Sequence, residues 1–202
     1  MRERKLFANL KKRTLAANEI PLLGCIVGKN GVRPDPEKIK AIDDWPVPVD
    51  VKGLRNFLGL AACLHKYSRN YAEMTLHLSR ILKENDRWSW SAECQHSFEG
   101  IEKSLVQSPV LAIADQARPF HVVCDASDFA IGCALMQYDS DGVVRVVCYQ
   151  SRQLQAAERN YPVHDKELLA MKYALAKFRL YLLGDRLFIV YTDHASLRTA
   201  VK

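Results

Sequence analysis

Short apolar runs in the second half of the chain predict a β-sheet. Runs rich in β-branched and aromatic residues lie at about 118–125, 130–138 and 143–150, and turn-forming residues separate them at 125–128 and 139–142. This alternation predicts three antiparallel strands joined by hairpins. A fourth run at 187–193 is almost wholly apolar and ends on a carboxylate, which predicts a strand buried on both faces.

A helix is predicted between the third and fourth of these strands. Pro162 suits the first turn of a helix and Gly184 suits the position just after its end. Between them the apolar residues recur at spacings of three and four: Leu168, Met171, Leu175, Phe178 and Leu182. A right-handed crossover through this helix places the fourth strand parallel to the first and beside it. The pattern therefore predicts an α/β fold (α+β mixed) with a mixed sheet.

The first half of the chain has a different, mainly helical pattern. The apolar run at 20–28 meets the turn-forming triplet Lys29–Asn30–Gly31, which predicts a hairpin. Asp50 and Ser91 are suitable N-caps for two amphipathic helices. We therefore divide the chain into a basic segment with a hairpin at 1–35, a small helical module at 36–110 and a sheet domain at 111–202.

Charge and cysteine usage restrict the class of protein. The chain carries 18 basic and 13 acidic residues up to Val110, and 11 basic and 10 acidic residues after it. An excess of positive charge in the first half suits contact with a phosphate backbone, although a mildly basic solvated surface accounts for it equally well. The six cysteines lack metal-binding spacing, and no apolar run is long enough to span a bilayer. We expect an intracellular protein with reduced thiols and no membrane partner.

Three carboxylates are expected to meet at one end of the predicted sheet. Asp125 ends the first strand, Glu167 lies in the opening turns of the crossover helix, and Asp193 ends the fourth strand. Clustered carboxylates repel one another unless a cation or a shared proton offsets them, and all-oxygen ligation suits Mg²⁺ or Mn²⁺. Such sites hold two ions about 4 Å apart. Each residue also has a plainer interpretation: an Asp that forms a turn, or a Glu that favours the helix dipole.

Several segments resemble the RNase H domain of gypsy-class LTR retrotransposon Pol polyproteins. They are VCDASDFAIG at 123–132, SRQL at 151–154, AERNY at 157–161, KELLA at 166–170 and YTDH at 191–194. The first half is similar to the end of the reverse transcriptase that precedes this domain. There FLGL at 57–60 and the segment from Trp88 to Phe98 resemble the thumb and connection, and LLGCIV at 22–27 resembles the primer-grip hairpin.

The resemblance implies a metal-dependent endonuclease that cuts RNA in RNA–DNA hybrids. Asp125, Glu167 and Asp193 would be its catalytic metal ligands, with two Mg²⁺ or Mn²⁺ ions in the intact family. The expected partners are a hybrid duplex, its phosphate backbone and the rest of the Pol polyprotein. The polymerase's paired aspartates are absent here, and the family's fourth carboxylate would fall beyond Lys202. We therefore expect a C-terminally truncated domain, and a non-catalytic nucleic-acid-binding remnant remains the alternative.

Overall fold

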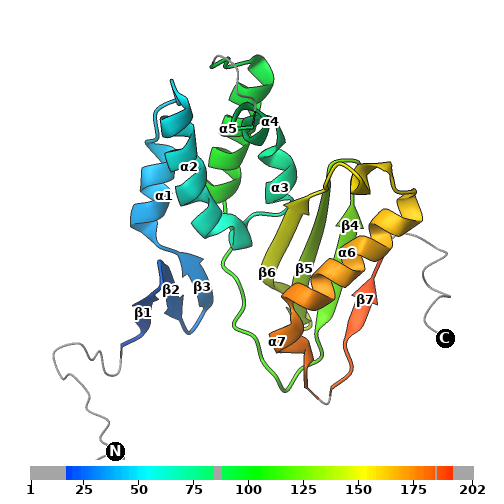
Figure 1. The fold of residues 1–202 in the computed structure, drawn as a ribbon. Helices are drawn as coiled ribbons and strands as arrows, with labels where there is room; N and C mark the ends of the chain where they lie inside the picture. The colour runs from blue at the N-terminus through cyan, green and yellow to red at the C-terminus, as the bar shows by residue number, and fades with distance from the viewer. Residues whose placement is uncertain (1–16, 84–87, 185, 193–202) are drawn as a thin grey trace, which may run out of the picture.

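The computed structural model describes residues 17–83, 88–184 and 186–192. A small three-stranded sheet and a group of helices lie on one side of the molecule, and a four-stranded sheet with a long helix across it lies on the other (Figure 1). Each side has its own hydrophobic core. The chain passes from one side to the other through the segment between Val106 and His121.

The small sheet is an antiparallel meander of three strands in the order β1 (Glu19–Leu22), β2 (Cys25–Gly28) and β3 (Gly31–Pro34). The predicted turn after Gly28 is confirmed, because Gly28 pairs with Gly31. The apolar run at 20–28 forms two strands, β1 and β2, joined by a second turn at Leu23–Gly24 that the sequence pattern did not indicate. Leu23 and Gly24 have φ angles of 51° and 78°, and positive φ at both central residues makes the tight turn that matches strand twist.

The helical module comprises α1 (Pro36–Asp43), α2 (Val51–Leu64), the 3₁₀ turn η3 (His65–Tyr67), α3 (Tyr71–Met74), α4 (Leu76–Ile81) and α5 (Ala92–Val106). Both predicted caps are confirmed: Asp50 accepts a hydrogen bond from the Gly53 amide at 2.6 Å, and Ser91 accepts one from the Cys94 amide at 3.3 Å. Tyr67 is only 1% exposed, so its ring packs in the core of the module.

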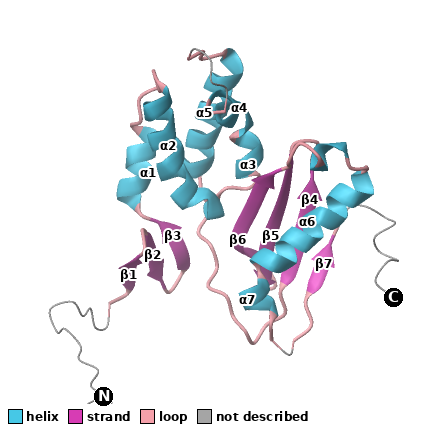
Figure 2. Ribbon diagram, viewed as in Figure 1, coloured by secondary structure: helices cyan, strands magenta, loops and turns pink. Residues whose placement is uncertain are grey.

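The larger sheet has the predicted mixed topology. Its strands are β4 (His121–Ala126), β5 (Ala130–Tyr138), β6 (Val144–Gln153) and β7 (Ile189–Tyr191), in the order β6-β5-β4-β7. Strands β4, β5 and β6 are antiparallel, and β7 runs parallel to β4. The 3₁₀ turn η4 (Glu158–Asn160), α6 (Val163–Lys177) and α7 (Arg179–Leu182) form the crossover, and α6 lies across one face of the sheet (Figure 2).

Two details of this half differ from the sequence pattern. Leu168 and Leu175 are 52% and 38% exposed, because α6 turns its smaller residues Ala170 and Ala174 toward the sheet. Small side chains let the helix backbone lie close to the strands. Strand β7 is an edge strand in which Ile189 and Tyr191 are exposed while Val190 packs against the core, so among the described residues it is not the doubly covered strand that its composition predicts.

Two cysteines form a pair of neighbours inside the larger sheet. Cys124 on β4 lies directly opposite Cys133 on β5, and both side chains are buried against the core beneath α6. Burial raises the pKa of the Cys124 thiol to about 12 and also raises the pKa of Cys133. Both thiols are therefore protonated at neutral pH.

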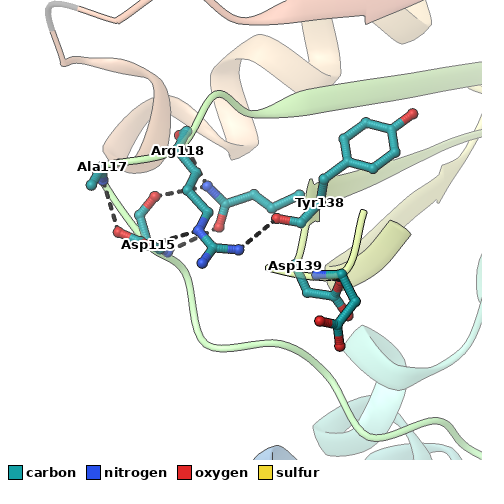
Figure 3. Close-up of polar contacts among 7 residues, drawn as sticks. Asp115, Ala117, Arg118, Tyr138 and Asp139 are labelled. Atoms are coloured by element: carbon teal, nitrogen blue, oxygen red, sulfur yellow. Dashed lines mark hydrogen bonds and ion pairs between the residues drawn. The ribbon is translucent and has the colours of Figure 1, made fainter. Parts of the chain in front are cut away.

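The side chain of Gln137 ties the connecting segment to the sheet. Its amide nitrogen donates to the carbonyls of Asp115 (2.7 Å) and Arg118 (3.1 Å), and its oxygen accepts from the Asp115 amide (2.9 Å). Arg118 in turn donates to the Tyr138 carbonyl and pairs with the Asp115 carboxylate, which also accepts from the Ala117 amide (Figure 3). These residues lie at the end of β4 and β5 that is away from Asp125.

Candidate functional site

Asp125 projects from the face of the larger sheet that α6 does not cover. Side chains alternate along a strand, and Val122 and Cys124 pack into the core beneath α6. The intervening Asp125 therefore points to the other face, where it is exposed. Its neighbour across the ladder is Gly132 on β5, which has no side chain to cover it.

Glu167 reaches the same end of the sheet from α6. Its side chain is 2% exposed, and its Oε1 accepts a hydrogen bond from the Ala126 amide at 3.2 Å. Its Oε2 accepts from the Thr192 hydroxyl at 3.4 Å. The carboxylate is thus held against the peptide that follows Asp125, and whether the two carboxylates share an ion stays a prediction.

Asp193, the third predicted ligand, lies outside the described residues. The residue before it in the sequence, Thr192, contacts Glu167. Within the described ranges no group of three or more His, Cys, Asp or Glu residues is arranged to hold a metal ion. The cluster of three carboxylates therefore stays a prediction.

The two described carboxylates suit a hard divalent cation. Asp125 offers an exposed carboxylate, and Glu167 offers a buried one that a backbone amide and a hydroxyl orient. Mg²⁺ and Mn²⁺ prefer oxygen ligands of this kind, and Mg²⁺ binds through one or two carboxylates while keeping several waters. The donor set therefore fits the expected ion.

A third acidic side chain near this end is already balanced by a cation. Lys166 Nζ lies 2.8 Å from Asp128 Oδ1, and the hydrogen bond and charge of Lys166 lower the pKa of Asp128. The lysine side chain is largely buried, whereas the aspartate is exposed. Asp128 therefore adds little net negative charge to the Asp125 end.

The helical module also contributes to this end of the sheet, which the sequence pattern did not indicate. A hollow of about 110 Å³ separates the Arg69–Asn70 turn from the sheet, and Asp125 and Gly132 line its other side. Glu73 lies with Asn70 and Asp125 around a smaller adjoining hollow. Such long-range contacts leave no mark on local periodicity. One sequence feature is consistent with this turn: residue 70 is an Asn, which tolerates the left-handed φ of 57° found there.

Hydrogen bonds hold this part of the module on the sheet. The Ala72 amide donates to Ser151 Oγ at 3.0 Å, and Gln153 Nε2 donates to the Ala72 carbonyl and to Ser79 Oγ, both at 3.2 Å. Strand β6 thereby fixes α3, and with it Asn70, relative to β4 and β5. The module and the sheet form one continuous surface around Asp125.

No helix in the part of the chain that the structure describes combines the length and the apolar character that crossing a bilayer requires.

Comparison with known sequences identifies similar proteins. The sequence profile of the family described as "RNase H-like domain found in reverse transcriptase" matches residues 90–190. The chain is 36% identical, over 97% of its length, to the retrovirus-related Pol polyprotein from transposon opus of Drosophila melanogaster, of which it spans 20%. It is 32% identical, over 98% of its length, to the Tf2-3 transposon polyprotein of Schizosaccharomyces pombe, of which it spans 15%.

Comparison with solved structures identifies the same fold. The foamy viral protease-reverse transcriptase in complex with an RNA/DNA hybrid matches 95% of this chain with a TM-score of 0.78 and 24% identity, and the match covers 26% of that chain. The same protein in complex with double-stranded DNA matches with a TM-score of 0.78 and 23% identity, and there the match covers 40% of that chain. The likeness extends over both the helical module and the larger sheet, since it covers nearly all of this chain.

Proposed function

Because the chain belongs to the family of RNase H-like domains found in reverse transcriptase, and its relatives are retrotransposon Pol polyproteins, we propose that it hydrolyses the RNA strand of RNA–DNA hybrids with divalent metal. The observation that supports this proposal is that Asp125 is exposed and that the Glu167 carboxylate accepts a hydrogen bond from the amide of the next residue, Ala126. Asp193 is the proposed third ligand.

The residues at this end would have distinct tasks. Bound Mg²⁺ or Mn²⁺ supplies an activated water and stabilises the leaving oxygen of the phosphodiester. Asp125 points outward and would bind the ion where a duplex can approach. The amide of Ala126 and the hydroxyl of Thr192 orient the Glu167 carboxylate, so it needs little rearrangement to act as a ligand. Preorganisation of this kind is what metal-dependent catalysis requires of a protein.

Binding of the duplex is assigned to the helical module. Its exposed basic side chains lie on several helices, on the Arg69 turn and in the turn after α4, and they are Lys40, Lys52, Arg55, Arg69, Arg80, Lys83 and Lys103. Such side chains bind backbone phosphates without reading sequence, and the affinity they give falls steeply with salt. The similar foamy viral structures contain an RNA/DNA hybrid and double-stranded DNA, which supports nucleic acid as the partner.

Cleavage of a labelled hybrid by the 202-residue chain tests the proposal. We expect cleavage of the RNA strand with Mg²⁺ or Mn²⁺, none in chelator, and none by Asp125→Asn with either metal. Asp141→Asn is the matched control, because Asp141 is an exposed aspartate in the β5–β6 turn. Salt-sensitive binding without cleavage by the unmodified chain in either metal would instead favour the non-catalytic alternative.

A further inference from the structure

We propose that Asn70 is a positioning residue of the candidate metal site, with its side-chain oxygen accepting a hydrogen bond from a water of the ion that Asp125 binds. This inference deepens the proposed function and rests on it. If so, the candidate metal site includes a residue of the helical module as well as residues of the larger sheet and α6.

The position of the Asn70 oxygen relative to Asp125 follows from the strand register. Asp125 and Gly132 face each other across the β4–β5 ladder. A Cβ atom built on Gly132 would lie 2.9 Å from Asn70 Oδ1. Cβ atoms of directly opposed residues are about 4.5–5.5 Å apart and lie on the same face of the sheet. The carboxamide oxygen of Asn70 therefore takes the place that a β5 side chain would have beside Asp125.

The carboxamide of Asn70 has no structural task in the described part of the chain. Asn70 precedes α3, and its backbone carbonyl accepts from the Glu73 and Met74 amides, but its side chain makes no capping hydrogen bond and has no hydrogen-bond partner among the described residues. Its backbone has a φ of 57°, which glycine would adopt at no steric cost. The backbone conformation thus explains why residue 70 is small. It does not explain why the residue has a side-chain oxygen that points toward the sheet.

The surrounding contacts hold Asn70 where it can act. Ser151 binds the Ala72 amide, and Gln153 binds the Ala72 carbonyl, two residues along from Asn70. Both anchors are on β6, which pairs with β5 next to Gly132. A positioning residue needs such support, because a site that is loose by about 1 Å loses much of its effect.

The chemistry of a carboxamide suits this place. Mg²⁺ keeps several of its waters when proteins bind it, and these waters donate strong hydrogen bonds. A neutral carboxamide oxygen accepts such a bond without adding another negative charge beside Asp125. Partners of this kind typically change metal affinity about 10–100-fold.

Titration of the 202-residue chain with Mn²⁺ and Mg²⁺ by calorimetry tests the inference without an activity assay. Asn70→Gly keeps the left-handed backbone and removes the oxygen, so we expect metal affinity to fall about 10-fold. Asn70→Asp keeps the oxygen and adds charge, so we expect affinity equal to or above that of the unmodified chain. Asp125→Asn should abolish binding in the same experiment.

The outcomes separate this inference from the proposed function. If Asp125→Asn abolishes binding and Asn70→Gly leaves it unchanged, Asn70 has no part in the site and this inference is overturned alone. If Asp125→Asn leaves metal binding unchanged, the proposed site itself is wrong. Gly132→Ala provides an independent check, because its Cβ would displace the Asn70 oxygen. It should weaken metal binding as Asn70→Gly does, and undiminished affinity would contradict the inference.

Hydrogen exchange at the Ala72 amide gives a second readout. That amide reports the hold of β6 on α3, because it donates to Ser151 Oγ. A metal-bound water shared by Asn70 and Asp125 joins the module to the sheet, so metal should slow the exchange of this amide in the unmodified chain. It should not do so in Asn70→Gly. Equal slowing by metal in the two proteins would overturn the inference.

Discussion

The two ends of the β4–β5 pair differ in the kind of buried polar side chain that they contain. At one end Gln137 is 4% exposed, and its carboxamide is fully used in holding the backbone of Asp115 and Arg118. At the other end Glu167 is equally buried and also accepts a hydrogen bond from a backbone amide, but its side chain is a carboxyl group, and the amide belongs to the residue after the exposed Asp125. Both side chains accept a hydrogen bond from a backbone amide, but the Gln137 side chain is neutral, whereas Glu167 is a titratable carboxyl group.

The comparison separates stability from ligand binding. A neutral amide that satisfies three backbone groups stabilises the fold, since each buried group left without a partner costs about 1–3 kcal/mol. A buried carboxylate gives much less, because the cost of removing it from water opposes its hydrogen bonds. We therefore expect variants at the two ends to fail in different assays.

The largest effect is expected from Glu167→Gln. The amide keeps the size of the side chain and an oxygen for the Ala126 amide, but it removes the charge. Loss of about 4 kcal/mol of transition-state stabilisation corresponds to a fall of about 1,000-fold in hybrid cleavage. The rate of RNA cleavage in excess Mg²⁺ measures it. A cleavage rate within about 10-fold of the unmodified chain would remove Glu167 from the proposed mechanism.

Gln137→Leu should show the opposite behaviour. It leaves the amide of Asp115 and the carbonyls of Asp115 and Arg118 without their partner, so the free energy of unfolding should fall by about 3 kcal/mol. Urea unfolding followed by circular dichroism measures this. The affinity of the folded protein for Mn²⁺ should be unchanged. The control is Gln155→Leu at an exposed position, for which little change is expected.

The smallest effect concerns the ion pair between Asp128 and Lys166. Lys166 lowers the pKa of Asp128 in the folded protein, so the pair stabilises the fold above the unfolded pKa of about 3.9. That contribution is lost as the pH falls through the lower folded pKa. The thermal midpoint of the unmodified chain should exceed that of Asp128→Asn at pH 6, and the gap should close toward about pH 2. A gap that is the same at both pH values would contradict this account.

Much of the fold could be predicted from the sequence because its determinants are local. The hairpin turn at 139–142, the caps at Asp50 and Ser91, and the crossover that sets β7 beside β4 all follow from nearby residues or from the handedness of the chain. The buried face of α6 could not be obtained in this way. Its leucines suggest one stripe, but the sheet accepts the alanines, since close packing against strands favours small residues.

In the candidate site, too, local features could be predicted from the sequence and long-range contacts could not. The places of Asp125 near the end of β4 and of Glu167 in the first turns of α6 could be predicted from the sequence, because strand and helix bounds depend on nearby residues. Asn70 could not, since its place beside Gly132 depends on how the helical module packs on β6. Asp193 lies outside the described residues, so its place in the site remains a prediction from topology and from the resemblance.

The neighbouring free thiols of Cys124 on β4 and Cys133 on β5 can report when the sheet opens. Cys124 and Cys133 are buried and protonated, so an alkylating reagent can modify them only after the strands separate. Cys63 on α2 is exposed and can react while the protein stays folded. Alkylation for increasing times, followed by peptide mass spectrometry, would then measure two modification rates in one sample. Modification of Cys63 would mark access to the folded surface, and modification of Cys124 or Cys133 would mark the opening of the strands that carry the site.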